Sequence, residues 1–166
     1  MKGEKKHATT SSSAFFSLIA ALGSIALLSP SSAIADPAGP RNGAAYLTTV
    51  KDSSGNFTTR TVLTLQADHT MSVVAADQGG PTFFFTSQLC SWKPDEKVGV
   101  IGRTLDFDYP PNADVVRIDY TITFDPDHDR ATGTETLTSF PLQKNPLDGG
   151  GTLLGTFTFT GELVKP

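Results

Sequence analysis

The stretch from residue 115 to residue 124, VVRIDYTITF, is the feature that most restricts what this chain can fold into. Its residues alternate in character, and one parity is apolar throughout: Val116, Ile118, Tyr120, Ile122 and Phe124. An alternation of period two is typical of a β-strand with one face in a core and one face in water. The chain must therefore supply further strands to cover the apolar face.

Segments of strand-forming composition recur from residue 45 to residue 163. The candidate strands are Ala45–Lys51, Phe57–Gln66, Met71–Ala76, Thr82–Thr86, Gln88–Trp92, Val98–Phe107, Val115–Phe124, Thr132–Phe140 and Thr152–Leu163. The segments between them are rich in Gly, Pro, Asp and Asn, which stabilise chain reversals. No stretch after residue 35 keeps a helical apolar period for three turns, so the predicted fold class is all-β.

Short connections favour strands that pair antiparallel in chain order, because parallel pairing needs crossovers of about a dozen residues. We expect a meander of about eight strands closed into a small barrel, since closure removes the exposed edges of an open sheet. A two-sheet β-sandwich is the alternative. A barrel of about eight strands is either just filled by its own side chains or just able to hold one small ligand. The apolar parity can therefore enclose a solid core or a cavity.

The first 35 residues have the layout of an export signal. A basic start at Lys2, Lys5 and Lys6 precedes an apolar run over Ala14–Leu28, and the small-residue sequence Ala33–Ala35 follows. This order of segments is typical of a secretory signal peptide that is removed after Ala35. We therefore expect an exported protein, periplasmic or extracellular.

The rest of the chain has room for one domain. We assign 1–35 to the signal peptide, 36–44 to a flexible segment leading into the barrel, and 45–166 to a single β-barrel domain. The apolar run of the signal is shorter than the ~20 residues of a membrane-spanning helix, and no later segment approaches that length. We expect no membrane span.

Charge gives no reason to expect a nucleic-acid partner. Without the signal segment the 13 basic and 17 acidic residues of the chain fall to 10 and 16, because Lys2, Lys5, Lys6 and Glu4 are lost. An acidic balance of this kind offers no attraction to nucleic acid or to an anionic membrane surface. The chain's net charge predicts a solvated surface.

Two charged residues share a parity with apolar neighbours. Arg103 alternates with Ile101, Leu105 and Phe107, and Glu135 shares its parity with Leu137. A charge removed from water is costly unless it is paired, so these two should meet each other or a polar ligand in the lumen. Alternatively, each lies near a barrel mouth with its stem on apolar surface and its head in water. The candidate ligand-binding residues, with the aromatic side chains that could line a pocket, are Arg103, Glu135, Tyr120, Trp92, Phe107 and Phe157.

The sequence offers little for a metal site or a cofactor. The segment 125–135, DPDHDRATGTE, has acidic residues at alternate positions, but Arg130 and Thr136 stand where a calcium loop needs glycine and glutamate. We interpret it as an acidic hairpin turn. The single cysteine, Cys90, cannot form an intramolecular disulfide, and we expect it to be a small buried apolar residue. We predict no metal and no cofactor, and assign no catalytic residue.

The size, the meander of strands, the CSW element (90–92) and the GTFTFTGEL strand (155–163) carry a resemblance at the level of architecture. The chain resembles lipocalin-like (calycin) barrels, although Cys90 stands where their Gly-x-Trp element has glycine. It also looks like the small barrels of the allene oxide cyclase and dirigent group. The first resemblance implies non-covalent carriage of a small molecule, and the second implies cyclisation or isomerisation in a shaped lumen.

Three functions are therefore open. The first is binding of a small, mostly apolar molecule in the lumen of an exported barrel. The second is a structural or interaction module with a filled core. The third is a cyclase or isomerase of the allene oxide cyclase-like type. The sequence does not give the ligand or the oligomeric state.

Overall fold

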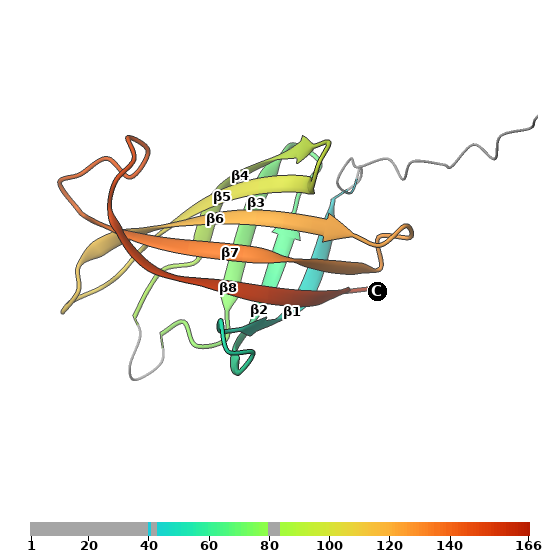
Figure 1. Cartoon of the computed structure of the whole chain (residues 1–166), viewed down its shortest axis with the longest axis horizontal. Coiled ribbons are helices and arrows are strands. Elements are labelled where there is room, and N and C mark those ends of the chain that lie inside the picture. The colour runs from blue at the N-terminus through green and yellow to red at the C-terminus, as the bar shows by residue number, and fades with distance from the viewer. Residues whose placement is uncertain (1–39, 41–42, 80–83) are drawn as a thin grey trace, which may run out of the picture. The chain divides into compact units, whose positions relative to one another are not determined.

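The chain forms a closed antiparallel β-barrel in the computed structural model, which describes Pro40, residues 43–79 and residues 84–166. Each strand pairs with the next in chain order and the last pairs with the first (Figure 1). The strands are β1 Ala44–Lys51, β2 Phe57–Leu65, β3 Thr70–Ala75, β4 Gln88–Asp95, β5 Gly99–Phe107, β6 Asp114–Phe124, β7 Arg130–Pro141 and β8 Thr152–Leu163. The predicted all-β meander and its closure are confirmed, and the β-sandwich alternative is wrong.

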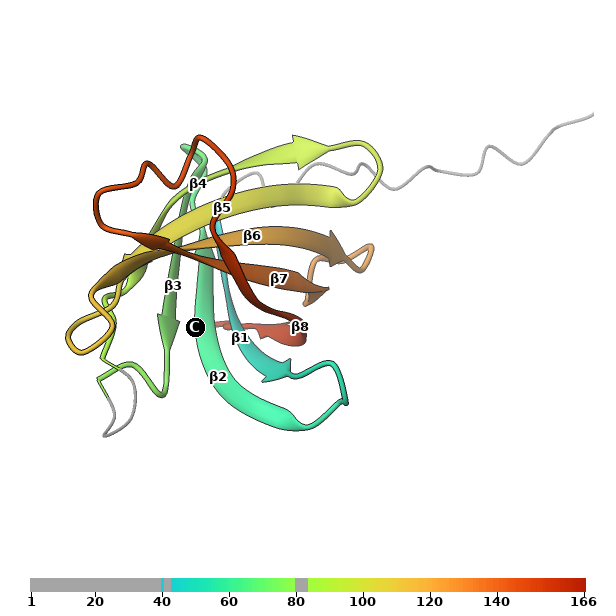
Figure 2. The same ribbon diagram turned by 60° about the vertical axis from the view of Figure 1, so that its left-hand side comes forward.

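Closure depends on the pairing of β1 with β8. Tyr46 lies opposite Leu163 and Val50 opposite Phe159, while the same residues of β1 face β2 on their other side. Figure 2 shows β8 running beside β1. Gly161 of β8 makes the close approach possible, because a Cβ there would lie 3.0 Å from Cγ2 of Thr48 and 3.2 Å from Cβ of Tyr46.

The eight strands agree with the expected number, but one of the nine candidate segments is not among them. Segment 82–86 was a predicted strand, but Phe85 makes only an isolated bridge to Asp108, and residues 80–83 lie outside the described residues. β3 and β4 are instead joined by a long connection at one end of the barrel (Figure 1). The predicted signal peptide and most of segment 36–44 also fall outside the described part of the chain, and β1 begins at Ala44.

Aspartate side chains shape the tight turns. In the β1–β2 hairpin, the Asp52 carboxylate accepts hydrogen bonds from the backbone N–H groups of Ser54 and Asn56, both at 2.9 Å. In the β6–β7 hairpin, Asp125 accepts one from the backbone N–H of Arg130 at 3.0 Å. The acidic segment 125–129 is therefore a hairpin turn, as predicted, because an aspartate can satisfy backbone donors that the ladder leaves free.

One half of the lumen is packed solid. At the end where β1 begins, inward side chains from most of the strands are almost wholly buried: Tyr46, Leu63, Leu65, Met71, Val100, Ile118 and Ile122. The parity predicted from residues 115–124 is confirmed, since Val116, Ile118, Tyr120 and Ile122 all belong to this core. Burial of this apolar set supplies the main driving force for folding. The single cysteine is free, so no intramolecular disulfide assists folding.

A second, smaller core lies outside the barrel. Val115 and Phe140 point outward as cross-strand partners, yet they are 6% and 2% exposed. The β7–β8 connection covers them: the Arg117 guanidinium lies 5.1 Å from the Phe140 ring centre and donates a hydrogen bond of 2.6 Å to the Pro146 carbonyl. This packing anchors the long β7–β8 loop at the same end of the barrel as the β5–β6 hairpin (Figure 1).

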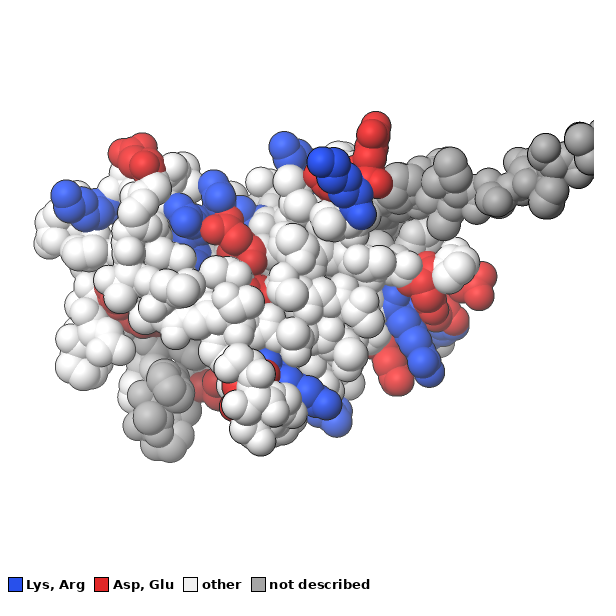
Figure 3. All heavy atoms as spheres, in the orientation of Figure 1, with Lys and Arg blue, Asp and Glu red and all other residues white. Residues whose placement is uncertain are grey.

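Surface charge is interspersed. On the face in Figure 3, basic and acidic side chains lie singly or in neighbouring groups of opposite sign. Ion pairs join Arg103 to Asp119 and Lys165 to Asp129, both at 2.6 Å. No helix long and apolar enough to cross a membrane occurs in the described part of the chain.

Candidate functional site: a carboxylate-lined cavity in the barrel

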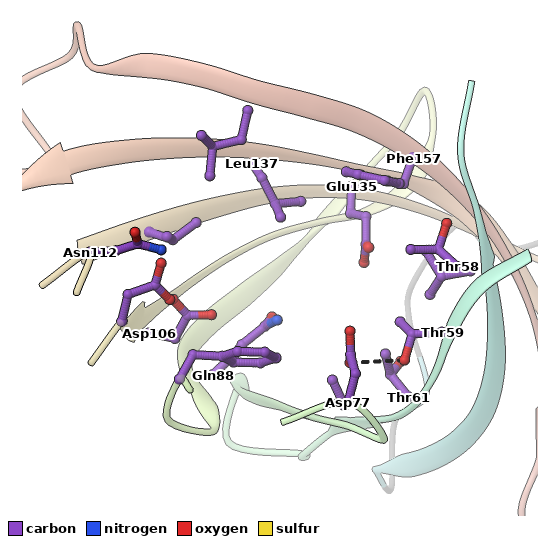
Figure 4. Close-up of a pocket in the computed structure, with 16 residues that line it drawn as sticks. Thr58, Thr59, Thr61, Asp77, Gln88, Asp106, Asn112, Glu135, Leu137 and Phe157 are labelled. Carbon is purple, nitrogen blue, oxygen red and sulfur yellow. Dashed lines mark hydrogen bonds between the residues drawn. The ribbon is translucent and has the colours of Figure 1, made fainter. Parts of the chain in front are cut away.

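The other half of the lumen holds a cavity of about 430 Å³. It opens among the ends of β3 and β5, the starts of β2, β4 and β6, and the inner faces of β7 and β8. Its apolar wall consists mainly of Val50, Val116, Leu137, Leu154 and Phe157. Four carboxylates also line it, from Asp77, Asp106, Asp108 and Glu135, and Figure 4 labels Asp77, Asp106 and Glu135. A solid core and a cavity thus share one barrel.

Glu135 reaches the cavity from β7. Alternation along β7 turns Ala131, Gly133 and Glu135 inward, and the cross-strand partner of Glu135 on β6 is the inward-facing Tyr120. Glu135 is only 9% exposed. Burial raises the pKa of its carboxyl to about 7, against the lowering effect of hydrogen bonding with Tyr120, and the charge of Asp77 adds to the rise. This carboxyl can change charge near neutral pH.

Asp106 faces the cavity from the end of β5. It is 4% exposed, and its Oδ1 atom has no hydrogen-bond partner among the described residues. Burial raises the pKa of Asp106 to about 7, and the nearby charges of Asp108 and Asp114 add to the rise. Burial likewise raises the pKa of Asp108 to about 6, with Asp114 adding to it. A buried carboxylate oxygen without a partner is costly, so this wall of the cavity is incompletely satisfied.

A polar layer separates the cavity from the filled core. The Tyr120 hydroxyl donates a hydrogen bond of 2.6 Å to Oε1 of Gln88, and the Thr104 hydroxyl donates one of 3.0 Å to the same oxygen. Burial raises the pKa of Tyr120 well above its usual value, so the hydroxyl stays a neutral donor. Gln88 also lines the cavity (Figure 4).

Asp77 lies across the cavity from Glu135. Figure 4 shows the two carboxylates pointing into the same open space from opposite walls. The Thr59 hydroxyl donates a hydrogen bond of 2.9 Å to Oδ1 of Asp77, which fixes the position of that side chain. Asp77 and Glu135, which are far apart in the sequence, therefore face the same cavity.

Three of the predicted site residues lie in or beside this half of the lumen. Glu135 and Phe157 line the cavity, and Tyr120 lies directly beneath it in the polar layer. Trp92 lies in the filled half instead. Its indole N–H donates a hydrogen bond of 3.0 Å to the Gln66 carbonyl, and its ring stacks on His69 with centroids 4.6 Å apart. Trp92 is therefore a core residue and not a wall of the cavity.

The inward orientation predicted for Arg103 and Phe107 is wrong. The Arg103 side chain is 45% exposed and pairs with Asp119 on the outer face, and Phe107 is 52% exposed. The parity of β5 is the reverse of the one expected, because Gly102 and Thr104 fill the narrow interior while the apolar Ile101 and Leu105 face outward. The same reversal brings Asp106 into the lumen.

Sequence reasoning missed Asp77, Asp106, Asp108 and Gln88. Assigning the opposite face of β5 to the interior would have identified Asp106. Nothing in the sequence indicated which face points inward, because the face that carries Asp106 also carries the small residues Gly102 and Thr104. Burial predicted for Cys90 is also wrong, since this cysteine is exposed.

A metal centre has no geometric basis in the part of the chain that the structure covers. There, no three side chains of His, Cys, Asp or Glu come close enough together to hold an ion. Comparison with models of known protein families, with curated proteins and with solved structures finds no match to this chain. The likeness to lipocalins rests on the closed eight-stranded antiparallel barrel alone.

Proposed function

We propose that this chain is an exported barrel that binds a small, mostly apolar molecule in the cavity, without a covalent bond. The observation that carries the proposal is the cavity itself, about 430 Å³ in volume, in a lumen whose other half is filled. Small-molecule sites have volumes of roughly 300–1,000 Å³, with apolar walls and a few polar groups that fix orientation. Export rests on the sequence of residues 1–35.

The filled half gives the cavity a fixed frame. Its strands continue unbroken into the cavity walls: β7 carries Ala131 in the core and Leu137 in the cavity, and β8 carries Phe159 and Phe157 in the same way. A site built on paired strands keeps its shape when it is empty. Binding then costs little reorganisation of the protein, which favours a carrier.

A fluorescence titration tests this function. The neutral apolar dye N-phenyl-1-naphthylamine should bind the protein saturably, and Leu137→Trp should weaken binding by placing a larger side chain in the cavity. Leu153→Trp is the matched control, because Leu153 lies on the outer face of β8 and is 65% exposed. Equal binding by both variants, or no saturable binding by the unaltered protein, would refute a lumenal site.

A cyclase or isomerase is the second candidate, and one observation favours it. Buried Glu135 and Asp106 both have a pKa raised to about 7, which suits proton transfer at neutral pH. Native mass spectrometry of protein purified from its own source would identify a co-purifying molecule. Recovery of that molecule unaltered after long incubation would favour binding, and its conversion would favour the enzyme.

A further inference from the structure

We infer that the cavity is built for an organic cation: a molecule with an ammonium nitrogen and an apolar body, whose charge lies against Glu135 and Asp106. This inference rests on the proposed function and adds the charge of the ligand to it. It follows from the composition of the cavity wall, from one unsatisfied buried oxygen and from the apolar surface between the acidic groups.

Within the described ranges, the cavity wall carries acidic side chains and no basic side chain that could neutralise them. Asp77, Asp106, Asp108 and Glu135 line it, and no lysine, arginine or histidine does so among the residues that the structure describes. On the outer surface, by contrast, Asp119 pairs with Arg103 and Arg117, and Asp129 pairs with Lys165. A lumen that buries carboxylates without a basic partner repels anions and favours a cation.

Asp106 supplies the second, independent observation. Its side chain is 96% buried on the wall of the cavity, and Oδ1 has no hydrogen-bond partner in the described structure. Such an oxygen is stabilised by a positive charge beside it, and an ammonium group supplies that charge. Asp106 lies across the lumen from Glu135 and Asp77 (Figure 4), so a cation between them meets acidic groups from more than one side.

Apolar and aromatic surface completes the site. Leu137, Val116 and Leu154 line the same cavity as the acidic groups, and the rings of Phe85 and Phe157 also reach it. Aromatic faces attract quaternary ammonium groups, and aliphatic walls bury a hydrocarbon body. A bare inorganic cation would leave this surface unused.

Carboxyl groups in the cavity ionise near neutral pH, so the inference can be tested by measuring binding at different pH values. Other acidic groups lie near Glu135 or near Asp106, which is at the end of β5. They are Asp77, which follows β3, Asp108, which follows β5, and Asp114 at the start of β6. The neutral hydroxyl of Tyr120 lies beside Glu135. Burial raises the pKa of Glu135 and of Asp106 to about 7. The cavity therefore gains negative charge as the pH rises from 5 to 8, and a cation of constant charge should bind more tightly over that range.

The experiment compares two molecules of the same shape. Phenyltrimethylammonium carries a permanent charge, and tert-butylbenzene is its neutral counterpart with carbon in place of nitrogen. Titrations followed by NMR chemical shifts at pH 5 and pH 8 should show phenyltrimethylammonium binding at least tenfold more tightly at pH 8. Glu135→Gln and Asp106→Asn should each weaken it about tenfold at pH 8, because each variant removes one negative charge from beside the cation. Asp127→Asn, in the exposed β6–β7 turn, should leave it unchanged.

Each other outcome overturns the inference in a recognisable way. If tert-butylbenzene binds as tightly as the cation at both pH values, the cavity binds apolar molecules and the charge assignment is wrong, while the proposed function stands. If neither molecule binds, the proposed function fails as well. If calcium chloride reproduces the shifts of Asp106 and Glu135 and phenyltrimethylammonium does not, the acidic wall binds a metal ion. If the cation shifts no signals of Val116, Leu137 or Phe157, it binds outside the lumen.

Discussion

Replacing Glu135 by Gln should change the pH dependence of stability. The Glu135 carboxyl has an ordinary pKa of 4.5, and burial raises it to about 7 in the folded barrel. Between these pH values the folded state binds more protons than the unfolded state, so stability present below pH 4.5 is lost as the pH rises through 7. A rise in pKa from 4.5 to about 7 corresponds to on the order of 3 kcal/mol. Gln has nearly the same shape and does not ionise.

We therefore expect Glu135→Gln to be more stable at pH 8 than the unaltered protein, and the difference should shrink by about 3 kcal/mol on going to pH 4.5. Urea denaturation followed by the fluorescence of Trp92, the single tryptophan, measures both free energies of unfolding. Glu96→Gln, in the exposed β4–β5 turn, is the control and should show no such pH dependence relative to the unaltered protein. A constant difference between Glu135→Gln and the unaltered protein across this range would refute the burial of an ionisable group at this position.

Three further predictions concern a close contact between strands, the hydrogen bond of Trp92 and the predicted signal peptide. Gly133→Ala should destabilise the barrel by on the order of several kcal/mol or prevent folding, because its Cβ would clash with the Thr121 carbonyl oxygen. Gly155→Ala should cost far less in the same urea denaturation, because its Cβ would meet only the Phe157 ring, at 3.1 Å. Equal losses of stability in the two variants would contradict the close approach at Gly133. Trp92→Phe should lower the free energy of unfolding by about 1 kcal/mol through loss of its indole hydrogen bond, measured by circular dichroism, and leave dye binding unchanged because Trp92 lies outside the cavity. Intact mass spectrometry of exported protein should give a chain that begins at Asp36, and retention of residues 1–35 would contradict the signal peptide.

The architecture could be predicted because alternation and turn chemistry agree along most of the chain. In β6 and β8 the two parities differ sharply in polarity, and both strands face as predicted. In β5 the inward positions are Val100, Gly102, Thr104 and Asp106, while apolar side chains face out. Periodicity identified the strand there but not its orientation, since the interior is narrow enough to need small residues and the outer face tolerates apolar ones.

The site was harder to predict than the fold, because its residues meet only through closure. Glu135 could be found, since it stands alone among apolar and threonine positions on its strand. Asp77 lies after β3 and Asp106 at the end of β5, and only the barrel brings both opposite Glu135. Their separation in sequence leaves no motif to recognise.

A crystal structure of the protein with N-phenyl-1-naphthylamine would test most directly whether this half of the lumen is a binding site. We predict electron density for the dye between Leu137, Val116 and Phe157, with the filled core unchanged around Tyr46 and Ile118. Collapse of these walls onto one another, or density for the dye only outside the barrel, would contradict the account.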